Sequence, residues 1–119
     1  MKAGDAMNGT RVGTPLYLSP EVIQSMPYDF KTDIWAAGCA LHHLAALEPP
    51  FQSDNLVTLG NLIVSRKPKA IPPVYSQRLN EFITKLMQKK AVDRPSAKQA
   101  ITMLPGFVQK GYENINLVA

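Results

Sequence analysis

The clearest pattern of apolar and polar positions along the chain follows Ser76. Five apolar residues recur there at spacings of three and four: Leu79, Phe82, Ile83, Leu86 and Met87. Such spacing places the side chains on one face of an α-helix. Because Ser76 is a favourable N-cap residue, we expect an amphipathic helix that begins directly after it.

A second pattern, between residues 32 and 47, is apolar at most positions around a helical wheel. Thr32 and Asp33 are good capping residues and predict the start of this helix, and Pro49-Pro50 ends it. A helix that is apolar on nearly all sides is usually buried. We therefore expect this helix to be the central element of the core.

Capping signals predict two more helices in the first half of the chain. Ser19-Pro20-Glu21 supplies an N-cap, a proline at the first helical position and an acid in the first turn. The short helix after it should end near Gln24. Ser53 or Asp54 should cap a further helix, whose apolar stripe consists of Leu56, Leu59 and Ile63.

The last predicted helix begins at Ser96, where Gln99 completes a capping box, and Pro105-Gly106 should close it. Residues 1–18 show no helical period, so they are expected to be loop. No pair of strands is evident. The pattern predicts a mainly α fold: a loop over 1–18, a helical domain over 19–104 and a tail over 105–119.

Composition restricts the class of protein. The 119 residues are enough for one domain, and the single Cys39 cannot form an internal disulfide. A reduced, cytoplasmic setting therefore fits best. The longest apolar run, residues 34–41, is too short to cross a bilayer, so no membrane association is expected. His42 and His43 lack nearby partners for a metal ion, so no metal site is expected.

The net charge is +4, and basic residues gather in two places. Arg66, Lys67 and Lys69 form one cluster. The second, looser cluster consists of Lys85, Lys89, Lys90, Arg94 and Lys98. Such clusters attract phosphate or acidic partners, or they form an ordinary solvated surface. No nucleic-acid module accompanies them, so nucleic-acid binding is not expected.

Three motifs occur in a fixed order and suggest a family. Residues 12–21 read Val-Gly-Thr-Pro-Leu-Tyr-Leu-Ser-Pro-Glu, residues 31–38 read Lys-Thr-Asp-Ile-Trp-Ala-Ala-Gly, and residues 92–96 read Val-Asp-Arg-Pro-Ser. Together they resemble the second half of a eukaryotic serine/threonine protein kinase. The resemblance implies the lower half of a kinase C-lobe, with the end of the activation segment and about five helices, and so an incomplete kinase domain.

Further motifs narrow the resemblance to the NIMA-related (NEK) kinases over about residues 10–104. These motifs are Pro50-Phe51, Asn55-Leu56 and Ile71-Pro-Pro-Val-Tyr-Ser76. The resemblance implies a substrate-binding loop, whose residues are Gly13, Thr14, Pro15, Leu16 and Tyr17. In such kinases the hydroxyl of the matching threonine, Thr14 here, hydrogen-bonds the catalytic Asp and Lys. Thr10 matches the activation phosphosite.

The resemblance also implies roles for four residues outside the loop. Glu21 and Arg94 would form a buried ion pair between the activation segment and the lower helices; the alternative is two unrelated surface charges. Asp33, as a helix cap, and Trp35 would anchor the catalytic loop.

The sequence given contains no Gly-rich loop, no Val-Ala-Ile-Lys, no His-Arg-Asp and no Asp-Phe-Gly. Phosphoryl transfer depends on these motifs. The family's function is transfer of the ATP γ-phosphate to Ser/Thr of proteins, with ATP and Mg in the full-length enzyme. This chain by itself is expected to bind no cofactor and to be inactive, so we leave open whether it is an enzyme.

Three interpretations follow. The chain is a kinase product truncated at its start, or a non-catalytic, pseudokinase-like remnant that binds substrates or another kinase chain, or an unrelated helical adaptor. The first two imply that one side of the 33–47 helix faces water, which favours self-association. Cytoskeletal or centrosomal placement would rest on family analogy alone.

Overall fold

The computed structural model describes residues 15–103, and within them the fold is mainly α, with no strand. The prediction of about five helices is confirmed, since five α-helices and two 3-10 turns occur there. In chain order they are η1 (Pro15–Tyr17), α2 (Pro20–Ile23), α3 (Lys31–Ala46), α4 (Leu56–Ser65), α5 (Gln77–Leu86), η2 (Ala91–Asp93) and α6 (Ala97–Met103).

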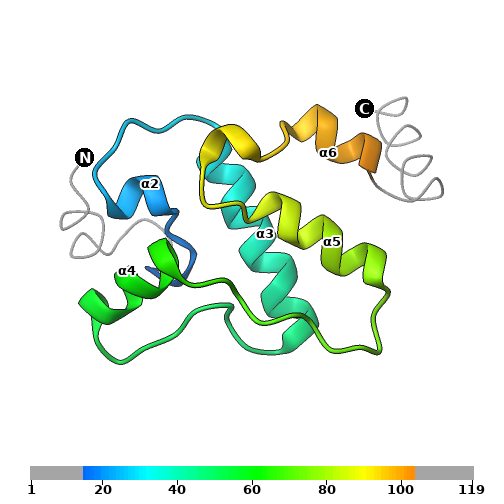
Figure 1. Ribbon diagram of the computed structural model, residues 1–119, viewed down its shortest axis with the longest axis horizontal. Helices are drawn as coiled ribbons and strands as arrows, with labels where there is room; N and C mark the ends of the chain where they lie inside the picture. Colours follow the sequence, from blue (N-terminus) through cyan, green and yellow to red (C-terminus); the bar gives the residue numbers. More distant parts are fainter. Residues whose placement is uncertain (1–14, 104–119) are drawn as a thin grey trace, which may run out of the picture.

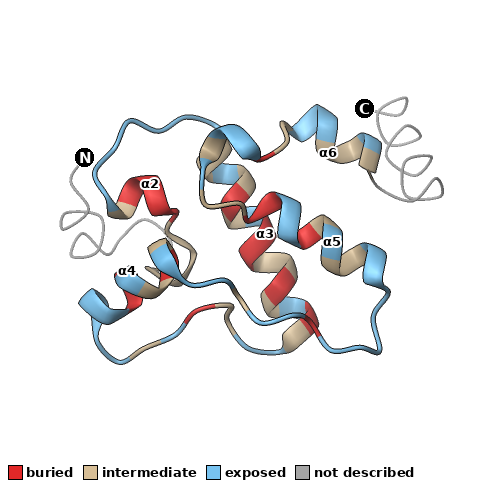
Figure 2. Ribbon diagram, in the orientation of Figure 1, coloured by how far each residue is buried: buried red, intermediate tan, exposed pale blue. Residues whose placement is uncertain are grey.

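Helix α3 is the central element (Figure 1). Helix α5 packs along it on one side, while α2 and α4 contact each other on the other side. The two 3-10 turns also pack against α3. The buried positions of α2, α3, α4 and α5 are shown in Figure 2 and lie where these helices meet. The apolar core consists mainly of Trp35, Cys39, Phe51, Leu59, Ile63, Ile71, Ile83 and Met87.

Gly38 lets α3 and α5 approach closely. A Cβ atom on Gly38 would lie 2.6 Å from Met87 Cγ and 2.9 Å from Leu86 Cβ. Both distances are shorter than van der Waals contact between carbon atoms. Glycine is therefore needed at this position because it has no side chain, and not because of its backbone conformation.

The predicted start of the central helix was wrong by one or two residues. Helix α3 begins at Lys31 with Phe30 as N-cap, and Asp29 Oδ1 accepts a hydrogen bond from the Lys31 N–H at 2.9 Å. Asp33 lies exposed in the first turn, so it is not the cap. Thr32 is not the cap either, because it lies inside the helix, and its hydroxyl donates to Glu21.

Helix α3 is central, as predicted, but it is not buried on every side. Asp33, Ala37 and Leu44 lie on one face of α3 and are exposed, and the Leu44 side chain is 73% exposed. No element of residues 15–103 covers this face, as expected if one side of the helix meets water.

The other helix starts mostly agree with their capping residues. Ser19 and Ser76 accept hydrogen bonds from backbone N–H groups of α2 and α5, and Ser96 and Gln99 form the predicted capping box. Helix α4 differs: its cap is Asn55 and not Ser53 or Asp54. The Asn55 Oδ1 atom accepts from two N–H groups, whereas Ser53 Oγ accepts only from the Asn55 N–H.

The loop predicted over residues 1–18 contains the 3-10 turn η1 where the structure describes it. The predicted end of the last helix at Pro105-Gly106 lies outside the described residues.

Candidate functional site

The structure brings together Glu21 and Arg94, which are 73 positions apart in the sequence. Arg94 Nη1 lies 2.7 Å from Glu21 Oε2, and Arg94 Nη2 lies 2.7 Å from Glu21 Oε1. The pair is therefore bidentate, the geometry that suits a guanidinium and a carboxylate best. Arg94 is 2% exposed and Glu21 is 6% exposed, so the pair is shielded from water.

Every N–H donor of the Arg94 guanidinium has an acceptor. Besides the two carboxylate oxygens, it donates to the backbone carbonyls of Gln88 at 2.7 Å, Lys31 at 2.9 Å and Lys89 at 3.2 Å. A guanidinium has five N–H donors, so none is left unsatisfied. Arg94 thus joins the first turn of α2, the start of α3 and the segment after α5.

Two hydroxyl groups extend this network. Thr32 Oγ1 donates to Glu21 Oε2 at 2.7 Å, and Ser19 Oγ lies 3.3 Å from Thr32 Oγ1. Because Thr32 gives its proton to the carboxylate, Ser19 is the donor in the second bond. The capping signals at Ser19 and Thr32 did not reveal that these two side chains hold the glutamate.

Lys31 forms a second link between the same segments. Its ammonium group donates to the backbone carbonyl of Arg94 at 2.6 Å and to that of Ala91 at 3.3 Å. The sequence offered no signal for this link, since a lysine at a helix start is ordinarily solvated.

The network shifts the titration of Glu21. Burial by itself would raise the pKa of its carboxyl, but hydrogen bonds from Arg94 and Thr32 outweigh burial and lower the pKa from 4.5 to about 2. The folded state therefore stabilises the charged form of the Glu21 carboxyl.

This shift predicts acid sensitivity. A carboxyl with a lower pKa in the folded state stabilises the fold above its unfolded pKa, and the stabilisation is lost as the pH falls. We expect the free energy of unfolding, measured by urea titration, to fall between pH 4.5 and about pH 2. The loss should be of the order of 3 kcal/mol. Glu21→Gln should flatten this fall, whereas the exposed Glu81→Gln should leave it unchanged. An unchanged pH profile for Glu21→Gln would contradict the assignment.

An aromatic cluster lies beside Arg94. Trp35 is fully buried and stacks on Phe51, with ring centroids 6.2 Å apart and planes inclined by 5°. The Arg94 guanidinium and the Lys89 ammonium each lie 5.2 Å from the Trp35 ring centroid. Such contacts are cation–π interactions, which strengthen when they are desolvated.

Lys89 is a residue whose role the sequence did not indicate. Its ammonium group also lies 4.5 Å from the Phe51 centroid and donates to the Ile63 carbonyl at 2.5 Å. Burial lowers its pKa to about 8. The sequence does not distinguish Lys89 from the other cations of its cluster, because two adjacent lysines near a helix end give no sign of burial.

Residues 15–17, the described part of the predicted substrate-binding loop, pack against α3. Tyr17 Oη lies 2.7 Å from His43 Nδ1, and the two rings meet edge to face. A cleft of about 560 Å³ lies beside them, lined by Tyr17, Ala40, His43, Leu44 and Leu47. The phenol–imidazole contact therefore positions η1 at the mouth of an apolar cleft.

The remaining predicted residues are distributed as follows. Pro15 and Leu16 lie in η1, whereas Thr10, Gly13 and Thr14 lie outside the described residues. Asp33 and Trp35 are not brought together, because Asp33 is exposed and Trp35 is fully buried. Their assignment as anchors of a catalytic loop stays a prediction.

Within residues 15–103 no three His, Cys, Asp or Glu side chains lie close enough together to hold a metal ion. In the same part of the chain no helix is long and apolar enough to cross a membrane.

Known proteins share this combination of motifs and helices. The family model described as the protein kinase domain matches residues 2–104. The chain therefore belongs to the protein kinase family, and its fold is the lower, helical half of the C-lobe.

Within that family the relatives are Nek kinases. The chain is 45% identical over 87 residues to human serine/threonine-protein kinase Nek5 and 44% identical over 92 residues to human Nek2. It is 36% identical over 106 residues to human Nek10. These matches cover 73%, 77% and 88% of this chain, but only 12%, 21% and 9% of the relatives. The chain thus spans about a tenth to a fifth of the length of these relatives.

Proposed function

We propose that this chain is the substrate-docking and structural part of a Nek-like serine/threonine protein kinase. In this role residues 13–17 receive the protein substrate near the phosphoacceptor. The Glu21–Arg94 pair holds that loop on the lower helices, and Asp33 and Trp35 support the catalytic loop. ATP and Mg²⁺ belong to the complete enzyme, and the chain by itself is inactive.

One observation carries this proposal: the buried, bidentate Glu21–Arg94 pair with its five satisfied donors. Leaving either charge unpaired inside the protein is costly. The pair therefore fixes the end of the loop that contains Pro15 and Tyr17 relative to α3 and α5. Such rigid placement is what a substrate-positioning loop requires, because orientation contributes strongly to catalysis.

A chimera tests the proposal. Residues 10–104 of this chain would replace the matching segment of human Nek2, and phosphorylation of a Ser/Thr peptide library would be measured with ATP and Mg²⁺. We expect phosphoryl transfer to be retained. Thr14→Ala in the chimera should abolish most of it, because the hydroxyl would contact the catalytic Asp and Lys.

The matched control is Thr58→Ala, at an exposed position of α4, which should leave the activity unchanged. Urea unfolding would establish that each chimera is folded. A folded but inactive chimera would overturn the proposal.

The second candidate function is a non-catalytic, pseudokinase-like module that binds substrates or another kinase chain. The exposed face of α3 favours it: Leu44 is 73% exposed and Leu47 is 87% exposed, beside the cleft at Tyr17. Apolar patches of this kind mark interaction surfaces, and a second copy of the chain is one such partner. A cytoplasmic setting is proposed with both functions, since the buried Cys39 is a free thiol.

A further inference from the structure

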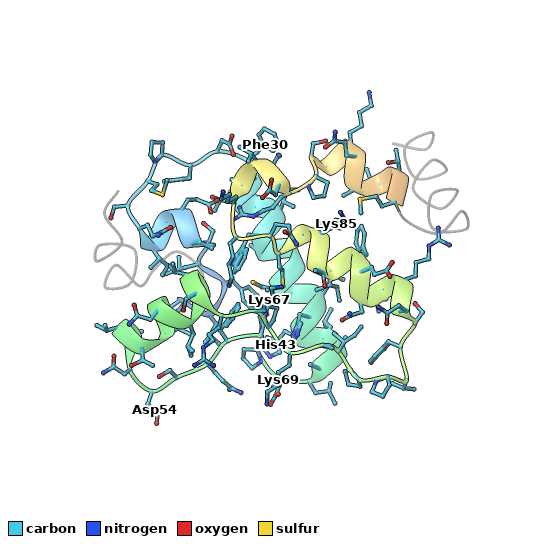
Figure 3. All side chains as sticks on the ribbon, viewed as in Figure 1. Phe30, His43, Asp54, Lys67, Lys69 and Lys85 are labelled. Atoms are coloured by element: carbon cyan, nitrogen blue, oxygen red, sulfur yellow. The ribbon has the colours of Figure 1, made fainter. Side chains whose placement is uncertain are left out.

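A basic cleft lies away from the Glu21–Arg94 network, where the segment between α4 and α5 crosses the lower half of α3 (Figure 1). The cleft has a volume of about 300 Å³, and its cationic lining residues are Arg66, Lys67 and Lys69. Figure 3 shows Lys67 and Lys69 on this crossing segment. The only acid among its lining residues is Glu48.

The three cations of this cleft are free to bind a ligand. Arg66, Lys67 and Lys69 are all exposed, and none of their side chains has a hydrogen bond or ion pair to another residue of 15–103. Arg94, Lys31 and Lys89 differ, because their side chains donate to acceptors within the protein. The cleft thus has three cations and one acid, Glu48, among its lining residues, and its net charge is positive.

The backbone that carries these cations is held at three points. The Arg66 N–H donates to the Leu62 carbonyl at 2.8 Å, and His42 Nε2 donates to the Lys69 carbonyl at 2.7 Å. Two residues further on, the N–H of the buried Ile71 donates to Asn80 Oδ1 at 3.3 Å. A fixed backbone lowers the entropy cost of binding, because fewer degrees of freedom remain to be ordered.

The buried His42 also lines the cleft. It is 4% exposed, and its Nε2 atom donates to the Lys69 carbonyl, so it holds the backbone of one of the three cations in place. A carbonyl can only accept, so Nε2 carries the proton in this bond.

We propose that this cleft binds the phosphate group of a phosphorylated serine or threonine on a partner polypeptide. A phosphate monoester carries nearly two negative charges and three acceptor oxygens. It can therefore meet the Arg66 fork and both lysine ammonium groups together, whereas a carboxylate has one charge and two oxygens. This inference does not depend on kinase activity of the chain.

The surroundings of the cleft fit a polypeptide better than a nucleic acid. Lys67 also lines an adjacent hollow of about 180 Å³, together with Thr84 and Gln88. Thr84 Oγ1 and Gln88 Nε2 donate to backbone carbonyls of the protein, and the side-chain oxygens of both residues can accept from a peptide N–H. Binding of single-stranded nucleic acid needs exposed aromatic rings for base stacking. The one aromatic residue lining the basic cleft, Phe51, is only 5% exposed.

Fluorescence anisotropy with the full chain tests the inference. The probes are a labelled phosphoserine peptide library with random flanking residues and the same library without phosphate, at physiological ionic strength. We expect the phosphorylated library to bind about tenfold more tightly, a difference that two or three charged contacts readily supply. The triple variant Arg66→Ala, Lys67→Ala, Lys69→Ala should lose this preference.

The matched control is Lys85→Ala, Lys90→Ala, Lys98→Ala, which removes the same charge from exposed positions elsewhere and should keep the preference. Urea unfolding checks that both triple variants are folded. Equal weakening by both triple variants, or equal binding of the two libraries, would overturn the inference. It would also be overturned if inorganic phosphate, a single-stranded oligonucleotide or anionic vesicles bound as tightly as the phosphopeptides.

Discussion

Replacing Arg94 by alanine is expected to lower the free energy of unfolding by about 3–5 kcal/mol, the range for leaving one partner of a buried ion pair alone. Glu21 would stay buried without its cation, and three backbone carbonyls would lose their donor. Urea unfolding followed by the fluorescence of Trp35, the single tryptophan of the chain, measures this loss.

The control for this substitution is Arg78→Ala, at an exposed position of α5. It should change the free energy of unfolding by less than about 0.5 kcal/mol, as is usual for surface substitutions. Arg94→Lys should be intermediate in effect, because a lysine keeps the charge but cannot form the bidentate contact. A loss below about 0.5 kcal/mol for Arg94→Ala would show that the ion pair does not hold the fold together.

Replacing Trp35 by alanine should be comparably costly, about 3–5 kcal/mol, because it leaves a large cavity in the centre of the core. The substitution removes the stacking on Phe51 and the cation–π contacts of Lys89 and Arg94 together. Lys89 and Arg94 would then face a void. Urea unfolding followed by circular dichroism measures the effect, since the fluorescent reporter is removed.

Trp35→Phe separates ring packing from the indole N–H. The Trp35 Nε1 atom is buried and has no hydrogen-bond partner among the described residues, so its removal breaks no bond. The phenylalanine variant should therefore be clearly more stable than Trp35→Ala. Tyr28→Ala is the surface control, because Tyr28 is 50% exposed. If Trp35→Ala and Tyr28→Ala cost the same, the assignment of Trp35 to the core would be wrong.

Both predictions concern one junction, where the end of the activation segment meets the lower helices. Glu21, Lys31, Trp35 and Lys89 gather around Arg94, so a change in any of them alters the environment of the others. Their effects on stability should therefore be non-additive, unlike those of distant residues. The placement of the substrate loop depends on this junction in the proposed function.

Local signals predicted most of the helices. Ser19, Ser76 and the Ser96–Gln99 box each begin a helix in the structure, because a cap bond forms between residues only three positions apart. The wrong predictions arose where several polar residues competed. At α4 the side chain of Asn55 satisfies two N–H groups, and at α3 the side chain of Asp29 accepts from the Lys31 N–H, ahead of Thr32 and Asp33.

The candidate site was predictable only through its resemblance to kinases. No periodicity relates Glu21 to Arg94, and nothing in the sequence indicated that Lys31 and Lys89 are drawn into the same region. A long side chain can be solvated or can donate into the interior, and the choice depends on which carbonyls the packed helices present. Lys31 donates to the carbonyls of Ala91 and Arg94, and Lys89 donates to the carbonyl of Ile63. Each of these carbonyls lies far along the chain from its donor.

The sequence by itself determined the helical class, most of the helix starts and the kinase family, because caps, apolar spacing and short motifs are properties of neighbouring residues. Only the tertiary structure decided which polar side chains are buried, which face of α3 meets water and where the cations of residues 66–69 lie. These properties depend on residues that are distant along the chain, and their free energies arise from desolvation and contact after the helices have packed.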